Sequence, residues 1–74
     1  MTDDEKFELF HRMLRMREKY KLPFSTISTN FGLSKHGFYE VRRFVERRAQ
    51  QGNQTAQSLI TEYNTLRQDE HYSY

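Results

Sequence analysis

Apolar residues recur three or four positions apart along most of the chain, a spacing typical of amphipathic helices that bury one face. The first such stretch consists of Phe7, Phe10, Met13, Leu14 and Tyr20. Thr2, with Glu5 three residues later, has the pattern of a capping box at a helix start. Pro23 disfavours helix in the residue before it. The pattern therefore predicts a first helix over about residues 3–20.

Residues 24–31 are rich in serine and threonine, which favour caps and turns over helix interiors. Other features nevertheless indicate a short helix. Ile27 and Phe31 lie four residues apart and share a helix face. Pro23 suits a helix start, and Gly32 suits the left-handed residue that ends a helix. We therefore predict a second helix over about residues 24–31.

The rest of the chain predicts two longer helices. Ser34 is a favourable N-cap. Apolar residues at helical spacing follow it, namely Phe38, Val41, Phe44, Val45 and Ala49. Gly52 and Asn53 then give a stop signal and a new cap. The last apolar stripe consists of Ala56, Leu59, Ile60, Tyr63 and Leu66. We predict helices over about residues 35–51 and 54–68, with a frayed tail over residues 69–74.

No stretch alternates between apolar and polar residues as a strand does, so we predict an all-α fold. A length of 74 residues favours one small helical domain of about four helices, with its helix-turn-helix in the centre. Such a small core gains stability from association, which favours a homodimer.

The composition argues against several functions. There is no cysteine, and His11, His36 and His71 lack the short spacing of metal ligands, so we expect no metal and no cofactor. No nucleophile elbow, phosphate loop or dinucleotide fingerprint occurs, so we do not expect an enzyme. No apolar run is long enough for a membrane span, and the acidic start is unlike a signal peptide. We expect a cytoplasmic protein.

The positive charge is concentrated in the middle of the chain. The formal net charge is only +2. Residues 12–48, however, contain ten lysines and arginines against three glutamates, whereas both flanking segments are net acidic. A basic centre between acidic ends is typical of a surface that binds a polyanion.

The segment from Phe24 to Phe44, FSTISTNFGLSKHGFYEVRRF, resembles the helix-turn-helix of Cro and phage-repressor-type DNA-binding proteins. That motif needs spaced apolar and small residues in two short helices that cross over a tight turn. The matching residues are Ile27, Ser28, Phe31, Gly32, Leu33, Phe38 and Val41. Serine stands at the small position where alanine is commoner in the family. The resemblance covers about 21 of the 74 residues.

The resemblance implies that the third helix is a recognition helix, which lies in the major groove of double-stranded DNA. Helical geometry places His36, Tyr39, Arg43 and Arg47 opposite the apolar side, with Lys35, Glu40 and Gln50 at the margins. Lys35 and Arg43 can donate to guanine, and Arg47 can reach phosphate. Glu40 would repel phosphate unless it accepts from a cytosine amino group or pairs with Arg43 or Lys35.

Other candidate contacts lie at helix starts. The backbone amide of Ser34 could hold a phosphate at the start of the recognition helix. Lys21, Ser25 and Thr26 lie around the start of the second helix, where they could touch the DNA backbone. We expect sequence-specific binding by a small transcriptional regulator or DNA-organising factor of a bacterium, phage or plasmid.

The last helix is a candidate dimer contact through Tyr63, Leu66 and Leu59, because its stripe can cover the core, pair with a twin helix, or do both. A different class of function also fits the sequence. The scaffold could bind a protein, as a phage-type inhibitor of a host protein does, because the net charge is low and aromatic residues are frequent.

Overall fold

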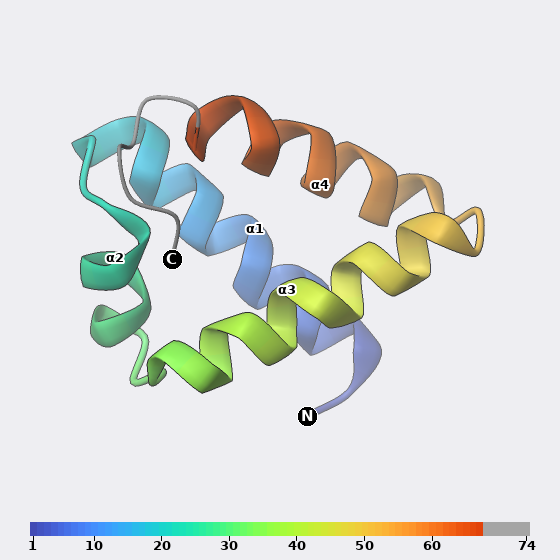
Figure 1. Cartoon of the computed structure of the whole chain (residues 1–74), viewed down its shortest axis with the longest axis horizontal. Coiled ribbons are helices and arrows are strands. Elements are labelled where there is room, and N and C mark those ends of the chain that lie inside the picture. The colour runs from blue at the N-terminus through green and yellow to red at the C-terminus, as the bar shows by residue number, and fades with distance from the viewer. Residues whose placement is uncertain (68–74) are drawn as a thin grey trace.

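The computed structural model describes residues 1–67, which form four helices and no strand (Figure 1). They are α1 (Asp3–Tyr20), α2 (Phe24–Asn30), α3 (Lys35–Gln50) and α4 (Gln54–Arg67). The predicted all-α class is confirmed, and each helix lies where the sequence pattern puts it. The second and third helices each end one residue earlier than predicted. Residue 68 and the predicted frayed tail lie outside the described residues.

Three long helices surround the core, and the short α2 joins the end of α1 to the start of α3 (Figure 1). α1 crosses α3 (Figure 1), so that Asp3 contacts Arg48 near the end of α3 while the Phe10 ring stacks on Phe38 near its start. The Arg17 guanidinium donates to the Leu66 carbonyl at 3.4 Å, which ties the end of α1 to the end of α4. α4 therefore packs within the protomer instead of projecting from it.

The helix starts are capped as the sequence predicts. Thr2 Oγ1 accepts from the Glu5 amide at 3.2 Å, and the Glu5 carboxylate accepts from the Thr2 amide at 2.9 Å. Ser34 Oγ accepts from the Gly37 amide, and Asn53 Oδ1 accepts from the Ala56 amide, each at 3.0 Å. These side chains satisfy amides that have no partner within the helix.

α2 and α3 end in the same kind of turn. Gly32 has φ +74°, and the Leu33 amide after it donates back to the Ser28 carbonyl at 2.8 Å. Gly52 has φ +95°, and the Asn53 amide donates to the Arg48 carbonyl at 3.0 Å. Both are Schellman motifs, in which a left-handed glycine lets the chain reverse sharply.

The centre of the core is a cluster of four aromatic rings, one from each helix: Phe10, Phe24, Phe38 and Tyr63. Phe24 and Tyr63 have ring centroids 5.1 Å apart, and the other contacts within the cluster are between 5.6 and 6.5 Å. All four residues are essentially inaccessible. Tilted ring contacts at these distances stabilise a core beyond simple burial of area.

Two of the three residues predicted as a dimer contact are buried within one protomer. Tyr63 is 1% exposed and Leu59 is 6% exposed, so their side chains belong to the core of one protomer. Leu66 is half-buried and packs against the same core. An apolar stripe has the same sequence pattern whether its own chain or a second copy covers it, and here its own chain does.

Candidate nucleic-acid interface

The residues that carry the resemblance lie around the turn between α2 and α3. Ile27, Ser28 and Phe38 are fully buried, and Val41 is 8% exposed. Ser28 fits because it is small and because its hydroxyl donates to the Ser25 carbonyl at 3.0 Å. Phe31 and Leu33 at the turn are half-buried and pack against the edge of the core. These residues fix how α3 leaves the turn and which of its sides faces solvent.

One side of α3, here called the outward face, is exposed along the length of the helix. It comprises His36, Tyr39, Glu40, Arg43 and Arg47, with Lys35 and Gln50 at its two ends. The opposite side carries Phe38, Val41 and Val45 and is buried. The structure thus brings together on one surface every α3 residue that the sequence nominated.

The lysine and arginines of the outward face have no acidic partner among the residues that the structure describes. Within residues 1–67, no carboxylate lies within ion-pair distance of Lys35, Arg43 or Arg47. Arg12 and Arg48, in contrast, lie 3.1 Å and 3.0 Å from the carboxylates of Glu8 and Asp3. The positive charge of the outward face is therefore available to an anionic ligand.

Glu40 takes none of the arginine or lysine partners considered from the sequence. Its carboxylate lies 3.5 Å from His36 Nε2, one helical turn before it. Both side chains are well exposed, at 59% for Glu40 and 84% for His36. The contact leaves Lys35 and Arg43 without a carboxylate in the described part of the chain.

A shallow hollow lies at the N-terminal end of the outward face, bordered by Lys35, His36 and Tyr39. The Tyr39 ring is 40% exposed and has cations on it: the guanidinium carbons of Arg42 and Arg43 lie 4.5 Å and 6.0 Å from its centroid. Polar and apolar surfaces thus meet at this hollow, as they do at the edge of a base pair in the major groove.

The candidates at helix starts form a second group. Lys21, Ser25 and Thr26 are exposed around the start of α2, and Lys21 ends α1 in a left-handed conformation with φ 58°. Ser34 is exposed at the start of α3, with its hydroxyl engaged in the cap. α2 lies between the end of α1 and the start of α3 (Figure 1). The candidates at helix starts therefore lie at both ends of α2.

Sequence reasoning missed two arginines that are buried. Arg17 is 7% exposed, and the Arg42 side chain is 13% exposed. The net positive charge of residues 12–48 includes both of these arginines. The charge exposed to solvent is therefore smaller than the sequence suggests. Their positions on the buried margins of their helices could have signalled this, because long arginine stems often lie along apolar surface.

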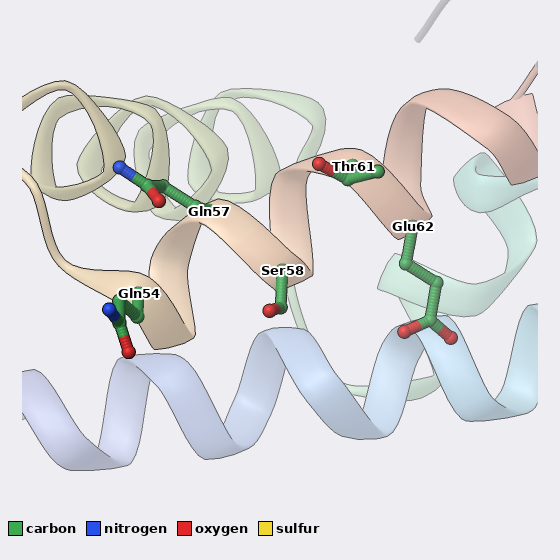
Figure 2. Close-up of a pocket in the computed structure, with 5 residues that line it drawn as sticks. All are labelled: Gln54, Gln57, Ser58, Thr61 and Glu62. Atoms are coloured by element: carbon green, nitrogen blue, oxygen red, sulfur yellow. The ribbon is translucent and has the colours of Figure 1, made fainter.

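The surface of α4 carries mostly uncharged polar residues. Gln54, Ser58 and Glu62 extend from one side of α4, whereas Gln57 points to the other (Figure 2), where it donates to the Ala49 carbonyl at 3.0 Å. These polar residues line an open hollow. Residues 1–67 contain no group of three or more histidine or acidic side chains placed to hold a metal ion.

Comparison with known proteins adds no relative. No protein-family model, no curated protein and no solved structure matches this chain. Among the described residues, no helix is both long enough and apolar enough to span a bilayer.

Proposed function

We propose that this protein binds double-stranded DNA in a sequence-specific manner through the outward face of α3. One observation carries the proposal: Lys35, Arg43 and Arg47 are exposed on one helix face and have no carboxylate partner in the described part of the chain. Unpaired cations along a helix that follows a tight turn suit a major groove lined by phosphates.

The proposed contacts divide by position along α3. Lys35, His36 and Tyr39, around the hollow, face base edges, and Arg43 donates to guanine. Arg47, further along the helix, contacts phosphate. Lys21, Ser25, Thr26 and the Ser34 amide contact the backbone as α2 crosses it. A protein with these contacts would regulate transcription or organise DNA by occupying its site.

The test is a titration of random and selected duplexes over a range of salt concentrations. We expect the logarithm of the affinity to fall linearly with the logarithm of the salt concentration. Arg43→Ala should reduce the preference for the selected duplex, while Arg47→Ala should weaken binding to both duplexes equally and lower the salt slope by about 1. Arg15→Ala removes an exposed arginine of α1 and is the matched control. A wild type that ignores DNA at low salt would falsify the proposal.

A second candidate function is protein binding, which the exposed aromatic rings favour. Tyr39 is 40% exposed and Tyr20 is 55% exposed. Tyrosine is enriched in the cores of protein interfaces. The salt dependence of binding separates the two functions. The affinity for DNA falls steeply as the salt concentration rises, whereas association with a protein through apolar surface responds little to salt.

Homodimer formation is also a proposal, supported by fewer exposed residues than the sequence suggests. Leu66 is the remaining α4 candidate, since Tyr63 and Leu59 are buried within one protomer. Sedimentation of the protein alone and on a palindromic duplex tests it. A monomer in both conditions would exclude a two-fold reading of DNA.

A further inference from the structure

Arg42 joins the recognition helix to the core. Its guanidinium carbon lies 4.5 Å from the Tyr39 ring centroid and 5.9 Å from the Tyr63 ring centroid. Tyr39 is on the outward face of α3, while Tyr63 belongs to the central aromatic cluster. The guanidinium therefore bridges an exposed ring and a buried one.

The hydrogen bonds of the fold do not account for an arginine at this position. Arg42 Nε is buried and has no hydrogen-bond partner in the described part of the chain. The nearest carboxylate, that of Glu46, lies 3.5 Å from Nη1 and is 40% exposed. A buried polar atom without a partner costs free energy, and an apolar side chain of similar length avoids that cost.

The bridge has a direct consequence for Tyr39. A tyrosine on an exposed helix face ordinarily samples several rotamers and loses that freedom when it binds. Here the guanidinium of Arg42, whose side chain is only 13% exposed, lies over the ring. The Tyr39 hydroxyl has no hydrogen-bond partner within residues 1–67. The ring is thus held in place while its polar tip remains available to a ligand.

We propose that Arg42 is a positioning residue for DNA recognition: it fixes the Tyr39 ring at the base-reading end of α3 without touching DNA itself. This inference rests on the proposed function, because it assigns Tyr39 a contact with bases. It gives two adjacent arginines different roles: Arg43 contacts DNA, whereas Arg42 holds the Tyr39 ring.

The test is a double-mutant cycle of Arg42→Met and Tyr39→Ala. Its readout is the affinity for a selected duplex divided by the affinity for a random duplex, which cancels the general effect of losing a charge. We expect each single variant to lower this ratio about tenfold, the range of one base contact. We expect the double variant to fall no further, since both substitutions remove the same contact. Arg15→Met is the matched control: it also removes an arginine charge, but Arg15 lies on α1, outside the proposed DNA-binding surface, so the ratio should not change.

The positioning role predicts that Arg42→Met retains or raises the thermal midpoint while it lowers the DNA preference. A merely structural role predicts the opposite pattern, namely a lowered midpoint with an unchanged preference, and that result overturns the positioning role. Effects of Arg42→Met and Tyr39→Ala that multiply in the double variant also overturn it.

A measurement on the free protein separates this inference from the proposed function. Couplings between the α and β protons of Tyr39 should indicate one χ1 rotamer in the wild type and averaging in Arg42→Met. Averaged couplings in the wild type overturn the inference even if DNA binding is found. A wild type that ignores DNA overturns the proposed function, and with it the role of Arg42 in recognition, whatever the couplings show.

Discussion

The Arg48 guanidinium lies 3.0 Å from the carboxylate of Asp3, which joins the last turn of α3 to the first turn of α1 across 45 residues of sequence. Arg48 also donates to Gln51 Oε1 at 2.8 Å and lies over the Phe44 ring at 5.2 Å. The ion pair is the outermost part of the packing between these helices. Because its side chains are 39% and 56% exposed, solvent screens much of the attraction.

Asp3→Asn should therefore lower the free energy of unfolding by less than about 1 kcal/mol. Asp4→Asn is the matched control, because Asp4 lies in the same helical turn and loses the same favourable interaction with the helix dipole, but has no arginine partner among residues 1–67. Urea denaturation at low and high salt measures the difference between the two variants. The ion pair contributes nothing if that difference is zero at low salt.

The capping box makes stability depend on pH through Glu5. The hydrogen bond from the Thr2 backbone, followed by the contact with the Thr2 side chain, holds the pKa of Glu5 below its ordinary value of 4.5. The folded state therefore favours the ionised carboxylate. Its stabilisation is complete above the ordinary value and is lost as the pH falls through the lower folded value.

Glu5→Gln should remove this dependence, because an amide can still accept from the Thr2 amide but does not titrate. The thermal midpoints of wild type and variant should converge as the pH is lowered from 7 to about 3. Parallel curves over that range would show that Glu5 does not contribute to the acid sensitivity of the fold.

Alanine substitutions at two glycines should change the free energy of unfolding in opposite directions. Gly32 has φ +74° and open space where an added methyl group would lie, so Gly32→Ala meets only backbone strain, which costs about 1–2 kcal/mol. Gly37 lies in the first turn of α3, where an added Cβ would make ordinary contacts at 3.5 Å with Leu33 and Ser34. Gly37→Ala should stabilise the fold by up to about 1 kcal/mol.

Chemical denaturation of both glycine variants gives the sign of each effect. DNA affinity should be measured alongside, because Gly37 lies next to His36 on the proposed reading surface. A Gly37→Ala variant that is more stable yet binds DNA less well would indicate that the glycine serves a close approach of the backbone to DNA. Destabilisation by Gly37→Ala would contradict the prediction.

The helices could be predicted from the sequence because local signals agreed with the apolar period. Thr2, Ser34 and Asn53 cap helices, and Gly32 and Gly52 end them, each by chemistry within a few residues. The residues of the outward face of α3 could be predicted for the same reason, because counting residues along a helix shows which of them share a face.

The remainder depends on contacts between distant helices. Arg42 lies near the Tyr63 ring of α4, and Arg17 donates to the Leu66 carbonyl; the position of each arginine on its helix does not identify these partners. The burial of Tyr63 within its own protomer could not be predicted either, because hydrophobicity indicates that a face is covered and not which surface covers it.

The central aromatic cluster should dominate stability. Phe10→Ala removes a fully buried ring that contacts Phe38 and Tyr63, and should cost about 3–5 kcal/mol. Phe7→Ala is the control on the same helix: its ring is only half-buried and contacts Phe44 at 5.4 Å, so it should cost less. Thermal unfolding by circular dichroism distinguishes them, and equal losses would show that the cluster has no special weight.

Since each helix contributes one ring to this cluster, no helix can detach without breaking its ring contacts with at least two of the others and exposing the rings that remain. Such an arrangement favours unfolding in a single cooperative step, without a stable partly folded species. The surface carried by α2 and α3 thus depends on α1 and α4, and an excised Phe24–Phe44 peptide would lose both the rings that hold it together and the face it presents.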